Sequence, residues 1–141
     1  MPLLTQNRQF QWFANPTYIY PVVPAYAATL LKERGFTVLW DDGIAEGLTY
    51  NEWLERVKKE KPDVIAIETK TPVVKRHWKI IKELKGLSFK PVVILMGDHV
   101  TAFPEESLIE SPVDFVVTGG DFDFLLLSVC EGLSKKNLHR L

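Results

Sequence analysis

The segment with the most chemical potential is Gly97–Thr101, GDHVT in one-letter code, which offers a carboxylate, an imidazole and a hydroxyl. His99 is a candidate general base, metal ligand or ligand contact, because imidazole titrates near neutral pH. A single Asp beside a single His is weak evidence for catalysis or for a metal. The other two histidines, His77 and His139, fall outside the expected site loops. We therefore favour a ligand-contact or loop-structuring role for His99 and expect no metal site.

Hydroxyls and glycines follow two other apolar runs of the sequence. Thr69 and Thr71 stand just before an expected helix, where each either caps that helix or hydrogen-bonds to the polar edge of a ligand. Gly119 and Gly120 directly follow an apolar run. They either form a tight turn or let a flat or bulky ligand approach the backbone, because glycine suits both purposes.

The segment Asn15–Pro21 is aromatic and contains two prolines but no glycine. This composition argues against a phosphate-binding loop, because backbone amides approach a phosphate closely only where side chains are absent. Tyr18 and Tyr20 either cover the end of a sheet or contact a ligand. Neither a G-x-G-x-x-G motif nor a P-loop occurs in the sequence.

Composition excludes several classes of function. The single cysteine, Cys130, lies among leucines and is expected to pack as a small apolar residue. One cysteine cannot form an intramolecular disulfide, a thiolate zinc site or a three-cysteine iron–sulfur cluster within this chain. A formal net charge of −1 gives no electrostatic case for nucleic acid. Without a membrane-length apolar run or a signal-peptide pattern, we expect no membrane partner and a cytoplasmic protein.

The elements that position these residues follow an alternating pattern. Short runs rich in β-branched and aromatic residues alternate with stretches of helical periodicity, which is typical of a parallel sheet with crossover helices. The third and fourth runs are almost continuously apolar, as strands buried on both faces must be. The expected strands are Gln9–Ala14, Phe36–Asp41, Asp63–Glu68, Pro91–Met96 and Asp114–Thr118.

Helical stretches occupy the intervals between these runs. Thr49-Tyr50-Asn51-Glu52 has the spacing of a capping box, which predicts a helix that runs to about Lys61 and stops before Pro62. Glycines are expected to end the first and last helices, at Gly35 and Gly132. The other expected helices are Ala25–Arg34, Val73–Leu84, Glu105–Glu110 and Phe122–Leu133, and the inward candidates of the third helix are Trp78, Ile81 and Leu84.

We predict one α/β domain over residues 1–141, with its core at about 9–133. The expected architecture is a three-layer α/β/α sandwich around a five-stranded parallel sheet, flavodoxin-like (Rossmann-like), with strand order 2-1-3-4-5. Such sheets bind ligands outside the carboxyl ends of their strands. The expected site loops are Asn15–Pro24, Asp42–Leu48, Thr69–Val74, Gly97–Pro104 and Gly119–Asp123.

Four segments together resemble one known family. They are, in chain order, Tyr20–Gly35, Pro62–Pro72, Met96–Glu106 and Val113–Gly119. The third reads MGDHVTAFPEE and is similar to a Gly-Gly-x-His-Ala-Thr-x-x-Pro-Glu-Glu segment. With these segments the chain resembles, over roughly residues 9–133, the amino-terminal cobalamin (B12)-binding domain of B12-dependent radical SAM proteins.

This resemblance implies a cobalamin over the carboxyl ends of the strands, with its nucleotide tail entering the sheet. The Asp-x-His-x-x-Gly motif by which classical B12 domains supply a histidine to cobalt is absent from the first loop, as it often is in the radical SAM members, so no lower axial histidine from that loop is expected. Two departures, Met96 at a usual glycine and Phe122 in a usually Gly- and Glu-rich run, bear on cofactor affinity. The residues implied at the cofactor are Tyr18, Tyr20, Thr69, Thr71, Gly97, His99, Thr101, Gly119 and Gly120.

The implied function is a cobalamin-binding module that positions B12 for a radical SAM catalytic domain, which would carry out methyl transfer or a radical cyclisation or rearrangement. That barrel domain would be a partner in the same chain or in another one, and it would hold S-adenosylmethionine and a 4Fe-4S cluster. The chain is then a fragment of a longer protein and is not catalytic alone. The alternative is a domain of this fold that has lost the cofactor and acts in protein interaction or regulation. A small-molecule enzyme using His99 and Asp98 ranks last.

Overall fold

A computed structural model describes residues 20–43 and 45–138, with side chains as far as Lys135. The described residues form an α/β fold with three parallel strands and six helices. The strands are β1 (Val64–Glu68), β2 (Val92–Met96) and β3 (Phe115–Val117), in the sheet order β1-β2-β3. The helices are α1 (Val22–Glu33), α2 (Tyr50–Glu60), α3 (Val74–Lys85), α4 (Asp98–Ala102), α5 (Pro104–Glu110) and α6 (Phe122–Leu138).

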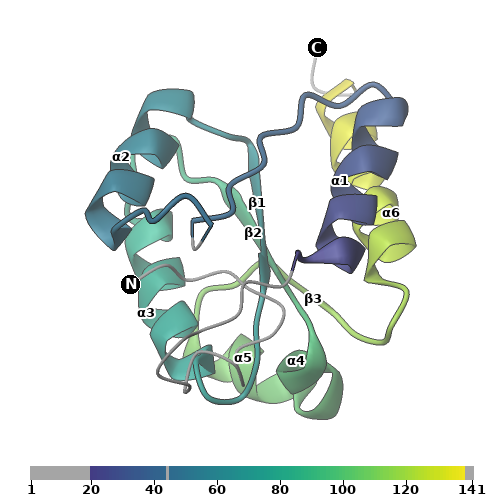
Figure 1. The fold of residues 1–141 in the computed structure, drawn as a ribbon. Coiled ribbons are helices and arrows are strands. Elements are labelled where there is room, and N and C mark those ends of the chain that lie inside the picture. Colours follow the sequence, from purple (N-terminus) through teal and green to yellow (C-terminus); the bar gives the residue numbers. More distant parts are fainter. Residues whose placement is uncertain (1–19, 44, 139–141) are drawn as a thin grey trace.

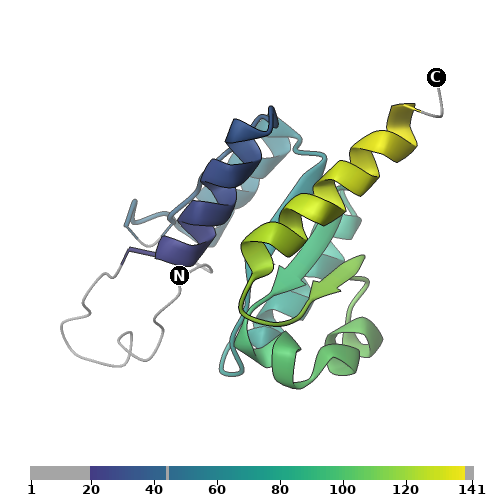
Figure 2. The ribbon, with the colours of Figure 1, turned by 90° about the vertical axis from the view of Figure 1, so that its right-hand side faces the viewer.

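Helices cover both faces of the sheet. Figure 1 shows α2 and α3 on one side of the strands and α1 and α6 on the other, while α4 and α5 lie beyond one end of the sheet. Figure 2 shows α1 and α6 side by side on their face, where the guanidinium of Arg34, the residue that follows α1, lies 3.9 Å from the Glu131 carboxylate of α6. Because β2 lies between the other two strands, its side chains are among the most buried of the molecule.

Two apolar clusters hold the layers together, one on each face of the sheet. The first joins α2 and α3 to the sheet through residues such as Trp53, Ile81 and Leu84. The second joins α1 and α6 to the sheet through residues such as Ala27, Ile94 and Leu126. The expected inward residues of α3 are confirmed, because Trp78, Ile81 and Leu84 are 6%, 0% and 0% exposed.

The prediction of a five-stranded sheet with order 2-1-3-4-5 is wrong for this structure, whose described residues contain three strands. The first expected strand, Gln9–Ala14, lies outside the described residues. The second, Phe36–Asp41, is described but forms no strand. β propensity favours an extended backbone, but a strand also needs a neighbour for its amide and carbonyl groups.

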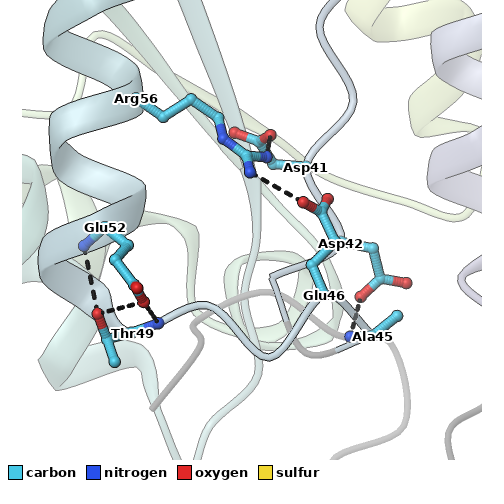
Figure 3. Close-up of polar contacts among 7 residues, drawn as sticks. All are labelled: Asp41, Asp42, Ala45, Glu46, Thr49, Glu52 and Arg56. Carbon is cyan, nitrogen blue, oxygen red and sulfur yellow. Dashed lines mark hydrogen bonds and ion pairs between the residues drawn. The ribbon is translucent and has the colours of Figure 1, made fainter.

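The segment Phe36–Asp41 instead crosses from one helical layer toward the other. Phe36 packs against the second cluster, whereas Leu39 and Trp40 are 56% and 39% exposed. The end of the segment is tied to α2 by Arg56, whose guanidinium lies 2.6 Å from Asp41 and 2.9 Å from Glu46 (Figure 3). Hydrogen bonds to Glu46 and Asp41 raise the pKa of Arg56.

The helix boundaries follow local signals in some places and not in others. The capping box is confirmed, because the Thr49 amide donates to the Glu52 carboxylate at 2.8 Å and the Glu52 amide donates to Thr49 Oγ1 at 3.3 Å (Figure 3). Gly132 does not end α6, which continues to Leu138, and this glycine does not adopt the positive φ that would turn the chain out of the helix. No helix in the described part of the chain is both long and apolar enough to span a membrane.

Candidate functional site

The carboxyl ends of the strands bring three loops to one edge of the sheet. The parallel register places Glu68, the last residue of β1, beside Met96, the last residue of β2. Met96 in turn lies beside Val117, the last residue of β3. The segments that follow these residues therefore begin next to one another, and they hold seven of the nine expected site residues.

Gly97 is required by the packing of this edge. Its φ of 112° and ψ of −172° lie in a region that only glycine adopts readily. A Cβ atom built there would lie 2.4 Å from the Thr69 carbonyl oxygen and 3.2 Å from Glu68 Cγ. The missing side chain of Gly97 thus lets the loops after β1 and β2 touch. The space that a side chain would need is occupied by Thr69 and Glu68.

Thr101 connects the loop after β2 to the loop after β3. Its hydroxyl donates to the Gly97 carbonyl at 2.9 Å and accepts from the Gly119 amide at 3.0 Å. Gly119 has a φ of 94°, and a Cβ atom built on Gly119 or on Gly120 would meet no heavy atom within 4 Å. The edge above these two glycines is therefore open, and their backbone is accessible to a ligand.

The hydroxyls of Thr69 and Thr71 each lie within hydrogen-bond distance of a histidine ring. Neither caps α3, because this helix begins after Val73 with no side-chain cap. Thr69 is fully buried and its Oγ1 lies 2.8 Å from Nδ1 of the equally buried His77. Thr71 is exposed and its Oγ1 lies 3.2 Å from Nδ1 of His99. Of the two threonines, Thr71 is therefore the one that a ligand can reach.

His99 is buried on α4, a short helix in a segment that the sequence indicated as a loop. The ring is 3% exposed and has Trp78 and Phe103 beside it, with ring centroids 6.2 Å and 5.6 Å away. Its Nε2 lies 3.2 Å from a Glu106 carboxylate oxygen of α5. The two atoms are not aligned as a hydrogen bond, so Nε2 has no hydrogen-bond partner among the described residues. His99 holds the loops together by its Nδ1 contact and its ring packing.

Lys70, which no motif in the sequence indicates, lies on the same edge of the sheet. Lys70 Nζ is 2.5 Å from the Asp98 carboxylate and 3.8 Å from that of Glu68. Glu68 is 7% exposed, although it carries a carboxylate at the end of a strand. Sequence alone gives no signal for this contact, because Lys70 and Asp98 are far apart in the chain and meet only through the pairing of β1 with β2.

Other expected site residues are not brought to this cluster by any described contact. Tyr20 is 61% exposed and its ring lies 6.3 Å from that of Trp40. Tyr18 lies outside the described residues.

In the described part of the chain, no three His, Cys, Asp or Glu side chains gather in a way that would hold a metal ion. Cys130 is 7% exposed, and burial raises the pKa of its thiol.

Met96 and Phe122, the two departures from the family pattern, both belong to the core. They are 4% and 7% exposed and pack in the second cluster, between the sheet and the helices α1 and α6. These side chains therefore fill space inside the domain at the carboxyl ends of β2 and β3.

Two known proteins are similar to this chain. An uncharacterized methyltransferase of Pyrococcus horikoshii is 30% identical over 115 residues, which is 82% of this chain and 25% of that protein. An anaerobic magnesium-protoporphyrin IX monomethyl ester cyclase of Rubrivivax gelatinosus is 29% identical over 101 residues, 70% of this chain and 18% of that protein. The chain thus spans a quarter or less of each relative. No family model matches the chain, and no solved structure matches it.

Proposed function

We propose that this chain is a cobalamin-binding module that positions B12 for a radical SAM catalytic domain outside it. The proposal rests on one observation, which is that hydrogen bonds link the loop after β2 to the loop after β3. Thr101 ties Gly97 to Gly119, and the space above Gly119 and Gly120 is open. A broad ligand at the carboxyl edge of a parallel sheet needs accessible backbone that it can approach closely. It also needs a small number of hydroxyls that fix its orientation.

The residues present fit a cobalamin at this edge. The cofactor is wide and mostly apolar with amide groups at its periphery, so small residues and isolated hydrogen-bonding groups suit it. Gly119 and Gly120 would lie under it, and Thr71 would offer an exposed hydroxyl. When bound, cobalamin supplies a cobalt centre that can accept and pass on a methyl group. This chain's own part is to hold the cofactor in place.

The relatives support a module whose chemistry belongs to another domain. One carries the name of a methyltransferase and the other of a cyclase, and each is several times longer than the matched segment. A single cysteine cannot hold a 4Fe-4S cluster, so we assign that cluster and S-adenosylmethionine to the partner domain. That domain would carry out methyl transfer or a radical cyclisation or rearrangement.

The test is retention of hydroxocobalamin under anaerobic gel filtration, followed by the visible spectrum of the protein peak. We expect the wild-type chain to keep the corrin and Gly119→Leu to lose about tenfold or more in affinity, as a cost near 1.4 kcal/mol implies. Gly35→Leu is the matched control, because Gly35 also has a positive φ of 88° and open space but lies after α1. Equal retention by both variants would refute the proposed binding surface.

A second function is favoured by the burial of Met96 and Phe122. If these side chains occupy the space that the nucleotide tail needs, the domain has kept the fold, lost the cofactor and acts in protein interaction or regulation. Exposed apolar side chains such as Ile109 and Phe124, at 78% and 62%, would suit such a role. This function predicts a wild-type chain that retains no corrin and a Met96→Gly variant that does.

A further inference from the structure

Three polar groups from different segments form a row at the carboxyl edge of the sheet. Thr71 lies before α3, His99 on α4 and Glu106 on α5. Thr71 Oγ1 is 3.2 Å from Nδ1 of His99, and Nε2 of the same ring is 3.2 Å from Oε2 of Glu106. The order is hydroxyl, imidazole, carboxylate, with the hydroxyl exposed and the imidazole buried.

This order determines which ring nitrogen of a neutral His99 carries the proton. A bare Nε2 would place its lone pair 3.2 Å from a Glu106 carboxylate oxygen, and their repulsion would be only partly screened, because the Glu106 side chain is 46% exposed while the His99 ring is buried. The proton is therefore favoured on Nε2, which leaves Nδ1 as an acceptor. The hydroxyl of Thr71 then donates to Nδ1, and the oxygen of this exposed residue is left to accept a hydrogen bond from a ligand.

We infer that Glu106, acting through His99, fixes Thr71 as a hydrogen-bond acceptor, so that the edge selects a ligand with an N–H donor such as a carboxamide over one with a carboxylate. This inference rests on the proposed function and names the ligand chemistry at one position. Glu106 and His99 are positioning residues here, and Thr71 is the group that meets the ligand.

The surroundings of the row support this selection. The His99 ring is 3% exposed with Trp78 and Phe103 beside it, and the Trp78 indole is itself fixed by donating to Ser107 Oγ at 2.9 Å. A ring flip that would exchange the two nitrogens therefore requires neighbouring side chains to move. Lys70, the cation next to Thr71, is engaged by Asp98 at 2.5 Å. The positive charge of Lys70, which would attract a carboxylate ligand, is thus already neutralised by the Asp98 carboxylate.

The first test does not involve cobalamin. Nitrogen-15 NMR of the histidine rings in the whole chain reports which nitrogen is protonated, and we expect His99 to be the Nε2–H form. Glu106→Gln should increase the Nδ1–H form, whereas Glu105→Gln, a change at an exposed neighbour on α5, should leave the wild-type form. A wild-type His99 in the Nδ1–H form would overturn the inference, whether or not the chain binds a corrinoid.

The second test measures selection directly. Cobalamin is compared with the isomeric monocarboxylic acids in which one peripheral amide has been hydrolysed. We expect the wild-type chain to bind at least one of these acids roughly tenfold more weakly than cobalamin, a ratio typical of one misplaced hydrogen bond. Thr71→Val and Glu106→Gln should reduce that ratio to about twofold or less, and Thr71→Ser should keep it.

The outcomes separate the two claims. A ratio that stays near tenfold in Glu106→Gln would overturn the inference while leaving cobalamin binding intact. Failure of the wild-type chain to bind any corrinoid would refute the proposed function and with it the ligand chemistry. The NMR result would still decide whether Glu106 sets the protonated nitrogen of His99.

Discussion

Gly97→Ala is the substitution whose cost the structure defines most sharply. The added Cβ atom would lie 2.4 Å from the Thr69 carbonyl oxygen and 3.2 Å from the Thr69 amide nitrogen, where the neighbours are backbone. Backbone atoms of a buried loop cannot move aside as the end of a flexible side chain can. The substitution must therefore separate the loops after β1 and β2.

Two costs add at this position. A residue other than glycine at φ 112° and ψ −172° costs roughly 1–3 kcal/mol in backbone strain. Overpacking against buried neighbours costs roughly another 1–3 kcal/mol. We expect Gly97→Ala to lower the free energy of unfolding by about 2–6 kcal/mol. Gly119→Ala, at a φ of 94° in open space, should cost only about 1–2 kcal/mol.

The assay is urea unfolding followed by tryptophan fluorescence, since Trp53 and Trp78 are buried at 8% and 6% exposure. The two glycine variants are compared under one condition, so the comparison isolates the steric contact with Thr69. If Gly97→Ala costs no more than Gly119→Ala, the close approach of the two loops is not a constraint on the fold, and the reasoning is refuted.

Two further predictions concern the core and the start of α2. Leu84→Ala should cost about 2–5 kcal/mol of unfolding free energy, because Leu84 is fully buried, whereas Leu125→Ala, at 43% exposure, should cost far less; equal values in urea unfolding would refute this assignment of the core. The Thr49 amide and hydroxyl lower the pKa of Glu52 below 4.5, so the stability from its ionisation is present above that pH and is lost as the pH falls through the lowered pKa. Wild type should therefore exceed Glu52→Gln in stability at pH 7 and lose that advantage as the pH falls through the lowered pKa, and a constant difference would count against the capping box.

The sequence predicted the central elements well because their signals are local. Residues 64–67 and 92–96 are apolar and rich in β-branched side chains, and the strands β1 and β2 lie within one residue of the expected bounds. The capping box at Thr49 and the left-handed turn at Gly35 are likewise set by residues a few positions apart. Such features depend little on the rest of the chain.

The errors come from features that depend on distant neighbours. Phe36–Asp41 has the composition of a strand, but pairing decides whether an extended segment joins a sheet. Thr69 and Thr71 stand where helix caps are common, yet each contacts a histidine from another segment. Glu106 approaches His99 only because α4 and α5 meet at a bend, which no pattern in the sequence specifies.

An anaerobic calorimetric titration of the wild-type chain with hydroxocobalamin and with methylcobalamin shows whether this domain binds a corrinoid. We expect saturable binding of one corrinoid per chain and a bound spectrum that lacks histidine coordination to cobalt from the first loop. The absence of binding heat with both corrinoids, and of corrin absorbance in the protein peak after gel filtration, would contradict this expectation.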